Sequence, residues 1–284
     1  MSTTIQQRYD DLIDIAATGT SARATYRHGP ALPKPCVHPI TTPAGACLTG
    51  FEMSDHVWHR GLWFTVKFIN GENFWEENAP CGVQTSAGQP AVTFAGPDVA
   101  RIEHALDWTS DKTGLVIRER RTLEVTQRDA VTTIDWTSDL HPEQDLLLDR
   151  TPYTTWGGYT GLTFRAAREV HGASFIVPGG SSVPQLLGDR HEWALLQGKV
   201  DGGTDRKIAV GIIDHPANPR GPTPWYGKSA DGYVFFNAAF LFHEPMSVRK
   251  GDALTFRYRV LCRDGHWTAE EFESLAADFR GGSQ

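Results

Sequence analysis

Several features that would assign this chain to a class are missing from its 284 residues. No apolar run approaches the roughly 20 residues that a membrane-spanning helix needs, so we expect no membrane partner. Asp and Glu total 34 against 27 Lys and Arg, and the net charge of −7 argues against a nucleic-acid partner. The polar start MSTTIQQRYDDLIDIA lacks the apolar segment of a secretory signal. Cytoplasm is therefore the expected localisation.

Cysteine is scarce and catalytic signatures are absent. No C-x-x-C pair joins the four cysteines, so we expect reduced, small apolar fillers rather than a disulfide framework: Cys36, Cys47, Cys81 and Cys262. The chain has no G-x-S-x-G elbow, no P-loop and no H-E-x-x-H motif. The glycine-rich GYTG and VPGGSS segments lack the strand–turn–helix context of a dinucleotide site. No cofactor is therefore expected.

The middle of the chain has the pattern of strands. LWFTVKFI, GLVIRERRTLEVTQ, AVTTIDWTSDL, KIAVGIID, DGYVFFNAAFLF and ALTFRYRVLC are runs of strand length, mostly bounded by Gly, Asn, Asp or Pro. In the second run the arginines punctuate a strand that we expect to be half exposed. The fold class predicted is mainly β, a sandwich.

Helices are expected at both ends of this β region. Ile5, Leu12 and Ala16 follow helical spacing, and Thr268 with Glu271 predicts a capping box for a C-terminal helix. We therefore divide the chain into an N-terminal helix with its lead-in (1–22) and a single β-sandwich domain ending in a helix (23–284). No repeat or flexible linker interrupts it.

The segment SDHVWHRGLWFTVKFINGENFW carries the most chemistry. His56, His59 and Arg60 precede an apolar strand that turns at Asn70-Gly71, and tryptophans flank them. General acid/base use of the imidazoles is expected because they titrate near neutrality. Two alternatives remain: strand-capping histidines, or a divalent metal at His56 and His59 completed by a distant ligand. Arg60 fits a substrate contact or a salt bridge.

A second polar segment, IIDHPANPRGPTPWYG, repeats this chemistry. Asp214, His215 and Asn218 lie in a turn stiffened by prolines, which suits a preorganised site. Asp214 alone is also compatible with an Asx-turn. We predict that both segments converge on one pocket, with Glu76, Glu77 or Glu244 as further candidates for a base.

Aromatic side chains are abundant enough to line such a pocket. Indole and phenol rings offer flat apolar faces on which the C–H faces of a sugar can stack. In a sandwich, however, a single tryptophan is more often part of the core. The expected substrate-binding residues are Trp63, Tyr153, Trp156, Asn218, Trp225, Asn237 and Glu244. The expected catalytic residues are His56, His59, Arg60, Asp214 and His215.

With these motifs in view, the chain resembles a bacterial family that carries the name "methane oxygenase PmoA". The resemblance rests on TPAGACLTG, DHVWHRGLWF with NGENFW, YTGLTFRAA, DHPANPRGPTPW and VLCRDGHWTAEEFESLAADF. It implies a galactose-mutarotase-like β-supersandwich, a superfamily that binds sugars on a sheet face and whose epimerases use a histidine acid with a carboxylate base. A membrane methane oxygenase would need transmembrane helices and a copper site, so the family name does not describe a function for this chain.

The function expected is acid/base proton transfer on a sugar or an oxidised (keto) glycoside, such as epimerisation, mutarotation or β-elimination. Two histidine-bearing loops exceed what recognition alone requires, which favours an enzyme. The alternative is a non-catalytic carbohydrate-binding protein. A small-molecule sugar is the expected partner, and a homo-oligomer is compatible with the sequence.

Overall fold

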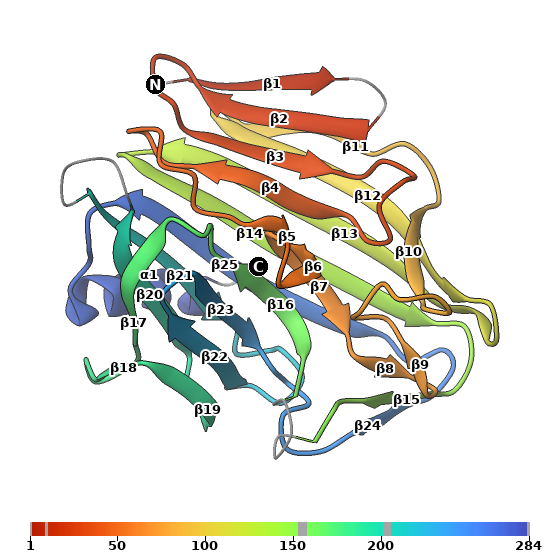
Figure 1. Ribbon diagram of the computed structural model, residues 1–284. Coiled ribbons are helices and arrows are strands. Elements are labelled where there is room, and N and C mark those ends of the chain that lie inside the picture. Colours follow the sequence, from red (N-terminus) through yellow and green to blue (C-terminus); the bar gives the residue numbers. More distant parts are fainter. Residues whose placement is uncertain (1, 9–10, 153–157, 201–205, 283–284) are drawn as a thin grey trace.

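Two large antiparallel sheets form a sandwich (Figure 1). The computed structural model describes residues 2–8, 11–152, 158–200 and 206–282, and all statements on the structure refer to these. In order across its width, the nine-stranded sheet contains β1 (Thr3–Arg8), β2 (Leu12–Ala17), β3 (Arg23–Arg27), β4 (Cys36–Thr41), β7 (Leu62–Val66), β16 (Thr160–Arg165), β23 (Tyr233–Ala238), β22 (Pro224–Ala230) and β19 (Gln185–Arg190).

The second large sheet has ten strands. Nine of them follow one path: β10 (Val83–Ser86), β12 (Val99–Ser110), β13 (Gly114–Arg128), β14 (Val131–Pro142), β25 (Leu254–Asp264), β21 (Arg206–Asp214), β20 (Trp193–Val200), β17 (Val170–Ile176) and β18 (Ser182–Val183). The tenth, β11 (Ala91–Gly96), pairs with β12 beside this path.

Two small sheets and one helix complete the described chain. The four-stranded sheet contains β24 (Met246–Val248), β15 (Leu146–Asp149), β8 (Phe68–Ile69) and β9 (Glu72–Asn73). The two-stranded sheet is the hairpin of β5 (Phe51–Met53) and β6 (His56–Arg60), and the helix is α1 (Ala269–Gly281). The predicted mainly β fold is confirmed, and each of the six predicted strand runs contains a strand.

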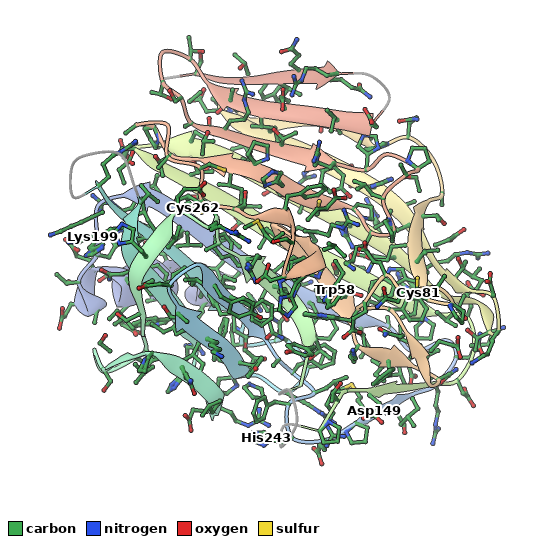
Figure 2. The ribbon with its side chains drawn as sticks, viewed as in Figure 1. Trp58, Cys81, Asp149, Lys199, His243 and Cys262 are labelled. Atoms are coloured by element: carbon green, nitrogen blue, oxygen red, sulfur yellow. The ribbon has the colours of Figure 1, made fainter. Side chains whose placement is uncertain are left out.

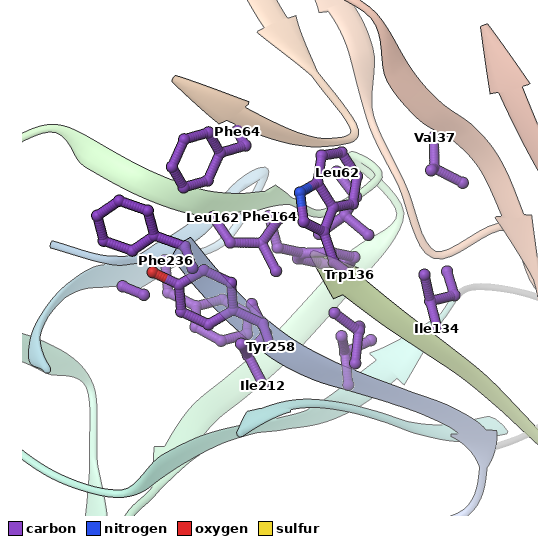
Figure 3. Packing of buried hydrophobic residues seen from close by; sticks show 14 of the residues in the cluster. Val37, Leu62, Phe64, Ile134, Trp136, Leu162, Phe164, Ile212, Phe236 and Tyr258 are labelled. Atoms are coloured by element: carbon purple, nitrogen blue, oxygen red, sulfur yellow. The ribbon is translucent and has the colours of Figure 1, made fainter. Parts of the chain in front are cut away.

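The main core lies between the two large sheets (Figure 3). Phe64 of the nine-stranded sheet meets Trp108 and Phe256 of the ten-stranded sheet, at ring-centroid distances of 6.3 and 5.3 Å. Strand side chains alternate between the two faces of a sheet, so every second residue points into this core. The alternate residues point to the two outer faces, and this alternation decides on which face each candidate functional side chain lies.

The arginines of β13 are not all exposed, although the sequence predicts a half-exposed strand. Arg118 and Arg120 are exposed as predicted, but Arg121 is completely buried. Its guanidinium pairs with the buried carboxylate of Glu119, with Nε 2.8 Å from Oε1. A register shift opposite Trp108 changes which residues of β13 point inward. A buried charge is tolerated here because its partner and hydrogen bonds are buried with it.

The predicted N-terminal helix is wrong. Residues 3–8 and 12–17 form β1 and β2, which pair antiparallel with Thr3 opposite Ala17. Ile13 and Ile15 alternate into the core at 0% and 1% exposure. The helical spacing is a property of this segment alone. Its pairing with β3 comes from the tertiary fold, and the hydrogen bonds of that pairing override helix propensity.

The predicted C-terminal helix is confirmed as α1. Thr268 accepts a hydrogen bond from the Glu271 backbone, and the Glu271 side chain bonds back to complete the capping box. Phe272 and Ala276 pack on Trp193 and Leu195, on the outer face of the ten-stranded sheet. Among the described residues, no helix has the length and apolar character needed to cross a membrane.

Only some of the cysteines are buried, although the sequence predicts small apolar fillers at all four positions. Cys36 and Cys262 are buried, as expected for small apolar side chains. Cys47 is exposed and Cys81 is partly exposed, so the interpretation is wrong for Cys47.

Candidate functional site

The first histidine motif forms the β5–β6 hairpin, which lies in front of the nine-stranded sheet in Figure 1. Gly61 turns the chain from this hairpin into β7 with a φ of +77°. A Cβ at this position would come within 2.7 Å of the Val37 carbonyl oxygen, so the turn requires glycine. Figure 2 shows Trp58 on the hairpin.

His59 is the buried centre of the site, with 1% of its surface exposed. Its ring stacks between the rings of His56 and Phe235, at centroid distances of 4.6 and 5.1 Å. Nη1 of Arg165 lies 3.4 Å from Nδ1 of His59. Because a guanidinium can only donate, Nδ1 accepts and the single proton of the neutral ring is on Nε2. Burial, and next the charge of Arg165, hold the pKa of His59 well below its usual range.

Arg165 joins the hairpin to the sheet from the end of β16. It is fully buried, and its Nη2 donates to Oδ2 of Asp55 over 2.7 Å. Its guanidinium lies 4.1 Å from the centroid of the Tyr233 ring, a cation–π contact. Burial works to raise the pKa of Asp55, but the hydrogen bond and charge of Arg165 outweigh it and lower that pKa. Oδ2 of Asp55 also lies 3.3 Å from Nδ1 of His56.

An aromatic layer covers the outer face of the sheet around His59. The neighbours of Trp63 in β7 point into the main core, so Trp63 points to the outer face, where this aromatic layer buries it. Trp75 stacks on Tyr159 with centroids 4.9 Å apart and planes at 25°. Tyr226 meets the edge of Tyr159 at 5.4 Å. Burial, and next the neighbouring Tyr226, raise the pKa of Tyr159, so its hydroxyl stays protonated.

A hollow of about 320 Å³ opens between the hairpin and this layer. Its lining is His56, Trp58, His59, Trp75, Glu76 and Tyr159. The Glu76 carboxylate is oriented by an ion pair with Lys67 and by a 2.8 Å hydrogen bond from Nδ2 of Asn73. Within the described residues, Nε2 of His59 has no hydrogen-bond partner. The hollow therefore combines aromatic faces, one carboxylate and an imidazole N–H.

Arg60, predicted to contact the substrate, is held by carboxylates instead. Its guanidinium binds both oxygens of Glu77 and one oxygen of Glu52, and it lies 5.1 Å from the centroid of Phe51. Glu77 also accepts a 2.7 Å bond from the buried ammonium of Lys34. The salt-bridge alternative describes Arg60 in this structure, and its contacts brace the hairpin that carries His59.

The second motif forms an internally bonded turn. Oδ1 of Asp214 accepts from Nδ2 of Asn218 at 2.7 Å, and Oδ2 accepts from the Thr223 backbone at 2.9 Å. Asn218 also bonds the Arg257 backbone through both of its amide atoms, each at 2.7 Å. Burial raises the pKa of Asp214 to about 7. These contacts hold the loop against β25. They supply hydrogen-bond partners to the Asp214 and Asn218 side chains within the fold, so neither needs a ligand as a partner.

The predicted convergence of the two motifs is wrong. The ring of His215 packs on Phe279 of α1, with centroids 5.4 Å apart. That helix covers the outer face of the ten-stranded sheet, whereas His59 packs with Trp63 on the nine-stranded sheet. The main core separates the two outer faces. Asp214 and His215 therefore do not share the hollow with His56 and His59.

The predicted substrate-binding residues have mixed placements. Trp63 packs against His59 and is fully buried, and its indole N–H has no hydrogen-bond partner among the described residues. Asn237 is buried on β23 and donates to the Thr160 carbonyl. Trp225 donates to the His191 carbonyl and packs on Phe236 in the main core, so its platform role is wrong.

Three further predicted residues lie away from the hollow or outside the described chain. The Glu244 side chain is 70% exposed, and its Oε1 lies 3.6 Å from Nη2 of Arg220. Glu244 is far from the hairpin in the sequence and does not line the hollow. Tyr153 and Trp156 lie outside the described residues.

Three residues of the site were not predicted: Tyr159, Arg165 and Tyr233. Tyr159 and Arg165 belong to the segment YTGLTFRAA, whose alternation places Arg165 and Thr163 on the face opposite to Phe164. Pairing this strand with β7 would have brought Arg165 to His59, but the sequence alone does not give the order of strands across a sheet.

The metal alternative for the histidines lacks a third ligand in the described chain. No group of three or more His, Cys, Asp or Glu side chains there is arranged to hold a metal ion.

Comparisons with known proteins complete the description of the site. Among curated protein sequences, none matches this chain. A galactose mutarotase related enzyme from Lactobacillus acidophilus aligns over 95% of this chain and 99% of its own, with 9% identity and a TM-score of 0.39.

Larger carbohydrate enzymes align as well. The GH36 alpha-galactosidase AgaA from Geobacillus stearothermophilus aligns over 94% of this chain and 41% of its own, with 9% identity and a TM-score of 0.40. A polysaccharide lyase aligns over 98% of this chain and 34% of its own, with 7% identity and a TM-score of 0.36. The chain spans well under half the length of these two proteins.

Sequence comparison identifies the family more directly than these alignments. A family model matches residues 13–277, which include both histidine motifs and most of α1. The model describes a family of unknown function, so the name "methane oxygenase PmoA" is not supported. The chain belongs to this family of unknown function, DUF6807.

Proposed function

We propose that the chain is a carbohydrate-active enzyme that transfers protons at a sugar or keto-glycoside held in the hollow of His56, Trp58, His59, Trp75, Glu76 and Tyr159. One observation carries the proposal: a buried neutral imidazole and a carboxylate line the same aromatic hollow. Trp58, which is partly exposed, offers a face for the C–H groups of a pyranose, and Glu76 accepts from its hydroxyls. A pocket of this size suits a monosaccharide or a small glycoside.

His59 is suited to polarise an oxygen atom of the substrate. Its Nδ1 lone pair faces Arg165, so Nε2–H is the atom left to donate to a carbonyl or ring oxygen. Its low pKa keeps the ring neutral, and a neutral imidazole stabilises a developing oxyanion by a hydrogen bond rather than by full protonation. Arg165 holds this orientation as a positioning residue.

Two groups are suited to act as the base. Glu76 lines the hollow as a carboxylate, and His56 lines it with Asp55 beside its Nδ1. Either one removes the proton from the carbon next to the carbonyl while His59 holds the enolate oxygen. Return of the proton to the other face gives epimerisation, and departure of a β-substituent gives elimination.

Turnover by site variants tests the proposal. We expect His59→Gln to bind the sugar but to lose about 10²- to 10⁴-fold in turnover, the range for a missing acid/base group. Of Glu76→Gln and His56→Gln, the variant that removes the base should show the same loss. Proton NMR in D₂O on panels of reducing sugars and keto-glycosides measures deuterium uptake at carbon. His215→Ala, on the opposite outer face, is the matched control and should keep full turnover.

The alternative is a non-catalytic carbohydrate-binding protein. One observation favours it: Lys67 and Asn73 already bind the Glu76 carboxylate, which weakens it as a base. Binding without turnover across both panels would support this alternative and contradict the enzyme.

A further inference from the structure

The buried cations beside the hollow are paired with carboxylates. Arg60 and Lys34 bind Glu77, and Arg60 also binds Glu52. Two further buried cations are paired as well: Lys67 with Glu76, and Arg165 with Asp55. Arg60, Lys67 and Arg165 have side chains no more than 8% exposed, so these cations are shielded from solvent.

The lining of the hollow presents one kind of charged side chain to a ligand. Among the described residues, the lining contains the carboxylate of Glu76 and no lysine or arginine. His59 is kept neutral, and any charge on His56 would face Asp55. Residues 153–157, which precede Tyr159 in the sequence, have no charged side chain. An anion entering the hollow would therefore meet a carboxylate without meeting a free cation.

We propose that the hollow selects uncharged sugars and rejects uronates and sugar phosphates, with Glu76 as the residue that determines this selectivity. The inference rests on the proposed function, because it names the substrate class of the same site. A carboxylate or phosphate placed beside Glu76 is repelled, and a partly buried site weakens solvent screening of that repulsion. The hydroxyls of a neutral sugar instead donate to Glu76.

An anionic ligand cannot take over Lys67 without loss. Lys67 is 6% exposed and its ammonium lies 5.2 Å from the centroid of the Phe68 ring. An anion that displaced Glu76 from this ammonium would leave the carboxylate with only the Asn73 hydrogen bond. Removing one partner of a buried ion pair costs more than forming the pair gains.

Lys228 is a cation on the nine-stranded sheet. It is exposed on β22, opposite Phe235, and does not line the hollow. Its substitution therefore serves as a control for general attraction of anions to the sheet.

Paired neutral and anionic probes test the proposal. The probes are methyl glucoside with methyl glucuronide and methyl galactoside with methyl galacturonide, measured by saturation-transfer NMR at fixed salt. We expect each neutral probe to bind at least about tenfold more tightly than its uronide, a difference of about 1.4 kcal/mol. Glu76→Gln frees Lys67 and should reverse the preference, whereas Glu76→Gln with Lys67→Met should abolish it.

The outcomes separate this inference from the proposed function. Equal or tighter binding of the uronides to the unaltered protein overturns the charge selectivity while leaving a sugar site in place. A ratio that Glu76→Gln leaves unchanged, in a variant folded by circular dichroism, overturns the role of Glu76. A change of ratio in Lys228→Met would assign the effect to the sheet surface and overturn it too. Failure of every probe to bind contradicts both proposals.

Discussion

At the scale of single residues, the most consequential contact is the one between Arg165 and His59. The sequence motif makes His59 a candidate catalytic residue, but its tautomer follows from a donor that is 106 positions away along the chain. Arg165 also donates a hydrogen bond to Asp55, so one guanidinium links the hairpin, the sheet and the carboxylate beside His56. The properties of the imidazole are therefore set by strand order rather than by its own motif.

Replacing Arg165 tests this dependence. In Arg165→Met we expect the pKa of His59 to rise towards its ordinary value, although burial should keep it below that value. The fixed Nε2–H tautomer should also be lost. Long-range ¹H–¹⁵N NMR of the imidazoles measures both. Arg168→Met removes an exposed arginine that bonds Ser54 of the same hairpin, and it should change neither. An unaltered His59 spectrum in folded Arg165→Met would contradict the account.

At the scale of elements, prediction succeeded where the pattern was local and long. The capping box of Thr268 and Glu271 gives α1, and the Asn70-Gly71 pair gives the turn between β8 and β9, with both residues at positive φ. It failed for β1 and β2, because the pairing with β3 decides their structure. Both kinds of result follow from whether the deciding hydrogen bonds lie within the segment or across the sheet.

The candidate site divides in the same way. The aromatic residues and histidines of the hairpin are close together in the sequence, so His56, Trp58 and His59 could be predicted as one group. The second motif looks equally functional, yet Asp214 and Asn218 use their polar atoms on their own loop. A sequence indicates which residues can hydrogen-bond but not whether the fold has already supplied the partners.

At the scale of the whole molecule, buried histidines make folding stability depend on pH. Burial, helped by neighbouring arginines, lowers the pKa of His104 to about 3 and that of His38 to about 4, and it also lowers that of His59. In the unfolded chain these rings titrate near about 6.5. The unfolded state therefore binds more protons below that pH, and stability is lost as the pH falls through this window towards the folded pKa values. The raised pKa of Asp214 acts in the opposite direction, since its contribution is lost as the pH rises through about 7.

His104 isolates one such contribution. Its ring nitrogens lie 2.8 Å from the Tyr26 hydroxyl and 3.0 Å from the Ser86 hydroxyl, and a glutamine amide can replace both hydrogen bonds. We expect His104→Gln to reduce the pH dependence of the unfolding free energy by about 1.4 kcal/mol per pH unit between pH 6 and pH 4. Urea unfolding at several pH values measures this slope. Exposed His141→Gln is the control, and equal slopes for the two variants would refute the assignment.

The central claim is that the hollow beneath the β5–β6 hairpin is the sugar site, and indole NMR tests it most directly. Trp58 and Trp75 line the hollow, whereas Trp193 and Trp267 pack under α1 on the opposite outer face. Each indole N–H is assigned by its Trp→Phe variant, and neutral sugars are then titrated into the ¹⁵N-labelled protein. The account predicts saturable shifts of the Trp58 and Trp75 signals with those of Trp193 and Trp267 unchanged. Saturable shifts of Trp193 or Trp267 with Trp58 and Trp75 unmoved would contradict it.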